Sequence, residues 1–270
     1  MQIKELKNEK NVALVEIHFT QTEVDTERNH VVDEMITQVT VKGFRQGKAP
    51  RNLAMEHLDQ TRLTDHILSH VLNNAVSEVI KEKKYRLLGR PVLQTLDPQN
   101  EKDGWKITIN FPLYPEVKLG DYQKLLTKKE TKSTTKKKIE TKSDNRLNEI
   151  YDTLLSKIKL DVPTPVIDEE VGYSVQRLEN QAKSLNLSLD SYLKAVNKTL
   201  EDVKAEYAKS AEDNLKLDLI LLEIAKTEKI DSSEEEIKQM AALSQAPESQ
   251  YPQIKSILDR RKTLEFLSKI

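Results

Sequence analysis

The chain has 270 residues, a formal net charge of −1 at pH 7, and charged side chains at 32% of its positions. This balance excludes the strongly basic profile of a nucleic-acid-binding domain, and the absence of cysteine excludes disulfide bonds, thiolate metal sites and a cysteine nucleophile. No run approaches the roughly 20 apolar residues that span a bilayer, and the N-terminus has no apolar segment of signal-peptide length. We therefore expect a cytoplasmic protein with no membrane partner, long enough for two domains.

The first part of the chain, residues 1–115, has the pattern of an α+β domain. Residues 13–19 and 105–111 alternate apolar and polar side chains, as half-buried strands do, and residues 92–94 are the expected hairpin partner of the second strand. Between these strands, apolar residues recur at the spacing of a helix. The order predicts an antiparallel sheet with helices on one face.

A short loop with two glycines separates two of the helical patterns. Glycine at both ends lets the backbone turn, and the aromatic ring and guanidinium between them have no strand or helix to bury them. Such side chains dominate interfaces, and arginine also pairs with carboxylates and phosphates. A simple turn with Phe44 folded back into the core explains the same spacing. The residues proposed as a docking surface are Gly43, Phe44, Arg45, Gln46, Gly47 and Lys48.

Residues 116–143 are expected to form a linker. From residue 127 onward this segment holds many lysines, two glutamates and almost no apolar side chain. Such a composition cannot bury enough surface to offset the entropy lost on ordering.

The remaining residues, 144–270, are expected to form an all-α domain. Two helix starts stand out, at Thr199 with Asp202 and at the serine pair 232–233, and Thr20 with Glu23 is a similar start in the first domain. Residues 215–224 are apolar on all sides of a helix. That pattern is typical of a helix at the centre of a domain, or of one partly exposed for binding.

Several kinds of chemistry have no residues to carry them. There is no glycine loop of the P-loop or dinucleotide type, so neither ATP nor another cofactor is expected. His66 and His70 are four residues apart, but Ile67 stands where a metalloprotease motif needs glutamate, so we expect no metal site. No nucleophile lies next to a base in the pattern, so no catalytic residue is proposed.

The loop Gly-Phe-Arg-x-Gly-Lys-x-Pro at residues 43–50 resembles the ribosome-docking loop of the bacterial trigger factor family. Residues 1–115 resemble the family's ribosome-binding domain, and residues 144–270 resemble its helical substrate-binding domain. The stretch Val-Pro-Thr-Pro at 162–165 and the leucine-rich stretch at 187–193 belong to the second resemblance.

The resemblance implies an ATP-independent molecular chaperone that docks at the ribosomal exit tunnel and shields nascent polypeptides during folding. Its implied partners are a large-subunit protein with adjacent ribosomal RNA, nascent and unfolded polypeptides, and a second copy of the chain off the ribosome. Gln46 departs from the family, where a basic residue is common, which puts one phosphate or carboxylate contact in doubt. The lysines of the linker offer another contact with ribosomal RNA, although charge runs are more often only solvated.

The implied client-binding surface lies in the helical domain. Core packing explains each of its candidate residues equally well. These candidates are Leu185, Leu187, Leu189, Tyr192, Leu193, Met240, Leu243 and Tyr251.

Most members of the family insert an FKBP-type prolyl isomerase domain where this chain has its lysine-rich segment. Residues 127–143 contain no aromatic side chain from which an isomerase pocket could be built. We therefore expect a variant of the family that lacks the isomerase domain and its activity. The alternatives are a chaperone with residual isomerase activity, a periplasmic chaperone of the SurA type, and an interaction module that does not bind ribosomes. The missing signal peptide and the Phe44–Arg45 pair argue against the SurA type.

Overall fold

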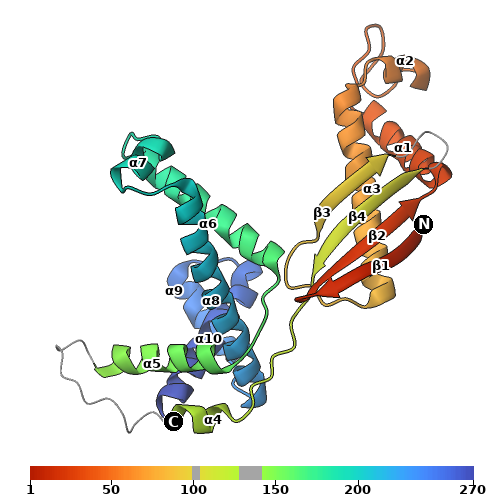
Figure 1. The fold of residues 1–270 in the computed structure, drawn as a ribbon. Coiled ribbons are helices and arrows are strands. Elements are labelled where there is room, and N and C mark those ends of the chain that lie inside the picture. Colours follow the sequence, from red (N-terminus) through yellow and green to blue (C-terminus); the bar gives the residue numbers. More distant parts are fainter. Residues whose placement is uncertain (99–103, 128–141) are drawn as a thin grey trace. The chain divides into compact units, whose positions relative to one another are not determined.

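The computed structural model describes residues 1–98, 104–127 and 142–270. The chain divides into two units, residues 1–114 with 163–166 and residues 115–162 with 167–270. The first unit contains a sheet and helices, and the second contains helices among its described residues (Figure 1). The predicted order, an α+β region followed by an all-α region, is confirmed.

A four-stranded antiparallel sheet forms one layer of the first unit. Its strands are β1 (Gln2–Glu9), β2 (Val12–Phe19), β3 (Val92–Pro98) and β4 (Trp105–Pro112), in the spatial order β1-β2-β4-β3. β3 pairs with β4, with Leu93 opposite Ile109, which confirms the predicted hairpin. Every second residue of β2 is buried, and Ile17 stands opposite Ile107 at the centre of the sheet. The period-2 pattern of the sequence therefore marks the face that packs on the helices.

Strand β1 is absent from the sequence-based prediction. Most of its side chains are exposed, so its sequence lacks the alternation that identifies a half-buried strand. A two-residue turn joins it to β2, with Lys10 and Asn11 at φ 48° and 60°. Turns with both central residues at positive φ match the twist of a hairpin. The Tyr85 hydroxyl donates a hydrogen bond of 2.5 Å to the Glu5 carboxylate, which fastens β1 to the segment after the last helix of this unit.

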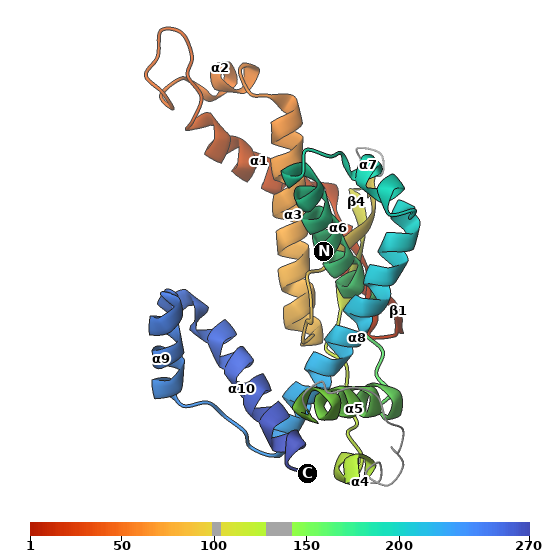
Figure 2. The same ribbon diagram turned by 90° about the vertical axis from the view of Figure 1, so that its left-hand side faces the viewer.

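Helices α1 (Gln21–Ile36) and α3 (Gln60–Lys83) cover one face of the sheet, and the short α2 (Arg51–Glu56) lies at one end (Figures 1 and 2). The predicted capping box starts α1, where Thr20 and Glu23 bond to each other's backbone N–H groups. Buried residues recur along α3 at a spacing of four, from Leu63 to Val79, and join the core of the sheet. This packing leaves residues 42–48 of the α1–α2 connection outside the core.

The second unit is built around one long helix. Its elements are α4 (Tyr122–Thr127), α5 (Lys142–Lys157), α6 (Thr164–Ser184), α7 (Leu189–Ala195), α8 (Leu200–Thr227), α9 (Glu234–Ser244), the 3-10 turn η1 (Glu248–Gln250) and α10 (Tyr251–Ser268). α5 and α10 both pack against α8. Ile220, Leu221 and Ile224 are at most 2% exposed, whereas Leu222 is 38% exposed. The apolar run at 215–224 is thus mainly the centre of a domain.

The predicted linker needs correction at its first half. Residues 115–127 belong to the second unit, where α4 buries Tyr122 and Leu126 to 4% and 2% exposure. These two residues are one helical turn apart, so they share a face. The Tyr122 hydroxyl also donates to the Glu228 carboxylate just after α8. The lysine-rich remainder, residues 128–141, lies outside the described residues.

Candidate functional site

The loop between α1 and α2 is closed by its own hydrogen bonds. The Gly47 N–H donates to the Val39 carbonyl at 3.1 Å, and Gln46 Nε2 donates to the Gln38 carbonyl, also at 3.1 Å. Gly43 and Gly47 have φ of +92° and +70°. A Cβ at position 47 would lie 2.4 Å from the Thr37 carbonyl oxygen, so only glycine allows this closure.

The tip of this loop presents the residues singled out in the sequence. Phe44 is 42% exposed, so its ring is not folded into the core, and Arg45, Gln46 and Lys48 are outside the core as well. The Phe44 backbone N–H donates to the carbonyl of Val41, whose side chain is only 6% exposed. We call residues 43–48 the docking loop, and Figure 2 shows it extending beyond α1 and α3.

The far end of the loop is also tied down. Arg51, the first residue of α2, donates through Nη2 to Asn29 Oδ1 at 2.9 Å, and its Nε lies 3.4 Å from Asp33 Oδ1. Both partners belong to α1. The docking loop is thus held at its base from two sides, while its aromatic and basic side chains stay accessible.

Five of the predicted client-binding residues lie around α7. Leu185 and Leu187 are 63% and 40% exposed, in the connection before α7. Leu193 is 5% exposed and packs with Leu178 and Val203, so it belongs to the core and not to a binding surface. Leu189 and Tyr192 are half-buried against that core.

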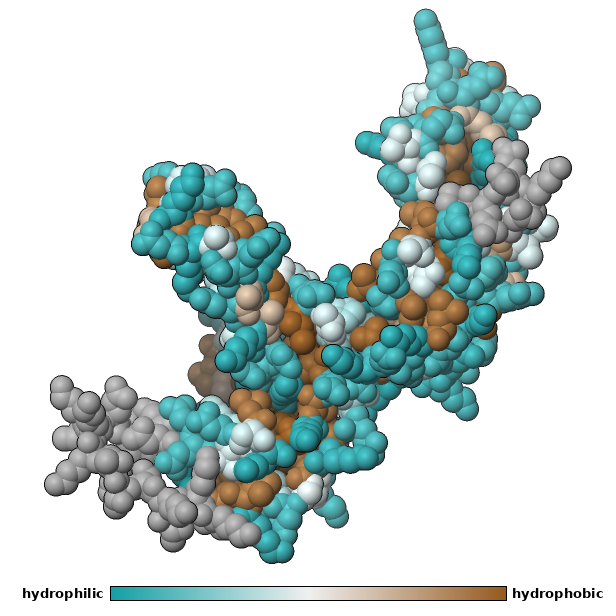
Figure 3. Space-filling model, in the orientation of Figure 1, coloured by the Kyte–Doolittle hydropathy of each residue, from teal (hydrophilic) through white to brown (hydrophobic). Residues whose placement is uncertain are grey.

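Two residues of this region escaped the sequence analysis. Val196 and Leu200 are 42% and 37% exposed, in and beside the connection after α7. Together with Leu185 and Leu187 they form what we call the α7 patch. Figure 3 shows apolar side chains gathered at the α6–α7 end of the second unit, with hydrophilic ones around them. No motif in the sequence separates these residues from core leucines.

The other three predicted residues lie in the hairpin of α9 and α10, which we call the arm (Figure 2). Leu243 is 83% exposed, whereas Met240 and Tyr251 pack on a small core of Ile237, Ala241 and Ile254. Ile257, which the sequence analysis also missed, is 63% exposed on α10.

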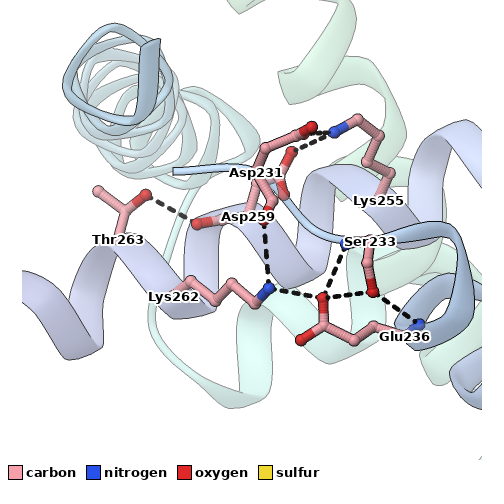
Figure 4. Close-up of polar contacts among 7 residues, drawn as sticks. All are labelled: Asp231, Ser233, Glu236, Lys255, Asp259, Lys262 and Thr263. Carbon is pink, nitrogen blue, oxygen red and sulfur yellow. Dashed lines mark hydrogen bonds and ion pairs between the residues drawn. The ribbon is translucent and has the colours of Figure 1, made fainter. Parts of the chain in front are cut away.

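A network of charged groups joins the arm to the connection that precedes it (Figure 4). Lys255 of α10 pairs with Asp231 of that connection and, at 3.2 Å, with Asp259. Lys262 Nζ donates to Glu236 at 2.6 Å and to the Asp231 carbonyl at 3.3 Å. The network therefore crosslinks α10, the start of α9 and the chain between α8 and α9.

Glu236 has two tasks in this network. Its carboxylate accepts the Ser233 backbone N–H at 2.7 Å and completes the capping box of α9, and it also accepts a hydrogen bond from the Lys262 ammonium. The hydrogen bond from Lys262 is the main reason why the pKa of Glu236 lies below its ordinary value, and the Ser233 backbone adds to the effect. Deprotonated Glu236 thus supports both the helix start and the arm.

His66 and His70, four residues apart in the sequence, both lie on α3. Within the described residues, no three His, Asp or Glu side chains are placed to hold a metal ion. His70 lies near carboxylates of α1, with Nε2 3.6 Å from Glu34 and Nδ1 3.9 Å from Glu27. Over the same residues, no helix combines the length and apolar character needed to cross a membrane.

Two family models match the chain and together cover it. The model of the bacterial trigger factor protein matches residues 1–146, and that of the trigger factor C-terminus matches residues 124–270. Since the matches overlap, no segment is left between them for an isomerase domain.

Individual relatives agree with these matches. The trigger factor of Streptococcus mutans is 26% identical over 182 residues, which are 67% of this chain and 42% of that protein. The trigger factor of Caldicellulosiruptor bescii is 30% identical over 123 residues, 44% of this chain and 28% of that protein. The matched parts thus span less than half the length of these relatives.

A solved structure has the same fold. It was published as "Promiscuous Substrate Recognition in Folding and Assembly Activities of the Trigger Factor Chaperone". The likeness has a TM-score of 0.65 at 13% identity and covers 100% of this chain and 99% of the other.

Proposed function

The chain belongs to the trigger factor family, and from this premise we propose that it is an ATP-independent chaperone which docks at the ribosomal exit tunnel and shields nascent polypeptides. One observation carries the proposal. The docking loop holds Phe44 accessible beside Arg45, on a backbone closed by its own hydrogen bonds.

The docking loop has the properties of an interface anchor. A loop held in one conformation loses little entropy on binding, and aromatic rings and arginines contribute most of the energy in many interfaces. Phe44 would enter an apolar site on a large-subunit protein, while Arg45 and Lys48 would pair with its carboxylates or with phosphates of adjacent ribosomal RNA. The Gln46 side chain donates a hydrogen bond to the Gln38 carbonyl, and it therefore stabilises the conformation of the loop.

Client binding is assigned to the α7 patch and to Leu243 and Ile257 of the arm. The related solved structure was described for promiscuous substrate recognition. Separate small apolar patches suit unfolded chains of varied sequence, since each contact is weak and release is fast. Release would then need no nucleotide. A second copy of the chain, off the ribosome, would cover the same side chains.

We also propose that the protein has no prolyl isomerase activity and works in the cytoplasm. The overlap of the two family matches at residues 124–146 supports the first statement. A proline-peptide assay with the purified chain should give the uncatalysed isomerisation rate. Chymotrypsin, which cleaves the peptide once its proline bond is trans, is the reporter in this assay. If the chain accelerates isomerisation at concentrations that do not change chymotrypsin's own activity, the alternative of a chaperone with residual isomerase activity is favoured.

Ribosome pelleting tests the docking proposal. The wild-type chain should co-sediment with ribosomes at low salt, and Phe44→Ala/Arg45→Ala should lose at least roughly tenfold in affinity. A matched control is Leu6→Ala/Lys7→Ala, since Leu6 on β1 is 43% exposed, much as Phe44 is, and also precedes a cation. Equal pelleting of both variants would remove the loop from the mechanism.

A further inference from the structure

A pocket of about 570 Å³ opens at the same end of the first unit as the docking loop. It is lined by the last turn of α1, the residues after α1 and α2, and the first turns of α3. Figure 1 shows these segments together at one end of the unit. The volume lies in the range of sites that bury a ligand or a large side chain.

The floor of the pocket is apolar. Met35 and Val39 line it and are partly buried against the core of the unit, and Leu58, which is 8% exposed, is part of that core. An apolar side chain that entered would extend the core and lose its contact with water, as the central anchor of a protein interface does.

The pocket and the docking loop share two residues. Gln38 and Val39 line the pocket, and their carbonyls accept the hydrogen bonds of Gln46 and Gly47 that close the loop. The pocket therefore adjoins the base of the docking loop. Filling the pocket would hold Gln38 and Val39 in the positions that the loop requires.

The charges at the rim select the kind of partner. Glu34 and Asp59 are both more than half exposed there, and Arg62 is the only arginine or lysine among the lining residues. Two carboxylates against one guanidinium disfavour a phosphate backbone. Gln38 and the imidazoles of His57 and His66 can bond to peptide groups.

From these observations we infer that the pocket receives an apolar side chain of a protein segment on the large ribosomal subunit. Docking then has two contacts. The Phe44 ring enters an apolar site on the ribosome, and an apolar side chain of a ribosomal protein enters the pocket. This inference rests on the proposed function, because it needs the docking loop to bind the ribosome.

Crosslinking identifies the occupant. The chain contains no cysteine, so His66→Cys creates a unique thiol in the pocket wall for a short photo-crosslinker. On ribosomes it should give a product with a large-subunit protein. Asp65→Cys, an exposed neighbour outside the pocket lining, should give a several-fold lower yield of that product. A product with RNA alone, or equal yields from both positions, would overturn the inference.

Filling the pocket tests its contribution to affinity. His66→Trp places an indole over the apolar floor and should weaken ribosome binding about tenfold, with Asp65→Trp as the matched control near wild type. Circular dichroism and the melting temperature show whether both variants fold. If folded His66→Trp binds ribosomes as the wild type does, the proposed role of the pocket is wrong, while the proposed role of the docking loop is unaffected. If the wild-type chain itself fails to pellet, the proposed function fails first and the pocket's role fails with it.

Discussion

The docking loop and the arm both expose apolar side chains, but different forces hold them in place. The loop is closed mainly by hydrogen bonds between neutral groups, from Gln46 and Gly47 to two carbonyls, and by a backbone turn that glycine alone permits. One ion pair, between Arg51 and Asp33, adds to its base. The arm has a core of three buried residues and relies on Lys255 and Lys262 to join it to the preceding chain. The proposed ribosome anchor is thus preorganised, while the proposed client-binding arm depends on ionic contacts that water and salt weaken.

The strongest test of this comparison is Gly47→Ala. The new Cβ would stand 2.4 Å from the Thr37 carbonyl oxygen, and φ of +70° adds strain of roughly 1 kcal/mol or more, so the loop must open. Ribosome affinity should fall more than roughly tenfold while the melting temperature of the second unit stays the same. Pelleting and calorimetry measure the two effects.

Gly43→Ala is the matched control for that variant. It has a similar strain at φ of +92°, but no atom lies within 4 Å of the new Cβ. Its loss of affinity should be several-fold smaller. Equal losses would show that positive φ, and not the close approach to Thr37, makes glycine necessary.

The exposed side chains of the arm offer the next largest effect. Leu243→Ser/Ile257→Ser should reduce the binding of an unfolded client about three- to tenfold, because the two apolar side chains together contribute on the order of 1 kcal/mol at a weak interface. Suppression of aggregation, followed by light scattering, measures it. Leu6→Ser on β1 is an exposed control in the other unit. Ribosome pelleting should not change in either variant.

Loss of the Lys262 contacts should loosen the arm only modestly, since its side chain is 32% exposed and that of Glu236 is 42% exposed. Hydrogen exchange of α9 in Lys262→Met should rise by about two- to fivefold. Lys238→Met removes a more exposed pair with Glu234, at 3.6 Å, and should leave exchange nearly unchanged. In contrast to the docking loop, wild-type α9 should also exchange faster at high salt.

The smallest expected effect is a dependence on pH. The folded-state pKa of Glu236 is lowered from 4.5 by Lys262 and the Ser233 backbone. A lowered pKa means that its contribution is present above about pH 4.5 and is lost as the pH falls through the folded value. An environment-sensitive probe on Leu243→Cys should report a looser arm as the pH falls below the lowered pKa of Glu236. The change should be smaller in Glu236→Gln, where only the pairs of Lys255 with Asp231 and Asp259 remain sensitive to acid. A probe on Phe44→Cys should respond less, because the hydrogen bonds of Gln46 and Gly47 contain no titratable group and Arg51 also bonds to the neutral Asn29.

Local patterns predicted much of the fold. The capping boxes at Thr20 and Thr199 start α1 and α8, and the alternation over residues 13–19 became a strand with one buried face. These features depend on contacts within a few residues, so short stretches of sequence contain the information. Strand β1 and helix α4 were missed because their positions come from distant partners, such as the Tyr85 hydroxyl that bonds to Glu5 and the Glu228 carboxylate that bonds to Tyr122.

The sequence by itself determined the family, the two-part organisation and the residues of the docking loop, because each follows from short motifs and local periodicity. Only the tertiary structure decided which leucines face water. Leu187 and Leu193 belong to the same short stretch, yet one is 40% exposed and the other 5%. It also placed a pocket beside the docking loop, because the end of α1 and the start of α3 meet there. Burial depends on what the folded chain brings against a side chain, and hydrophobicity alone does not specify that neighbour.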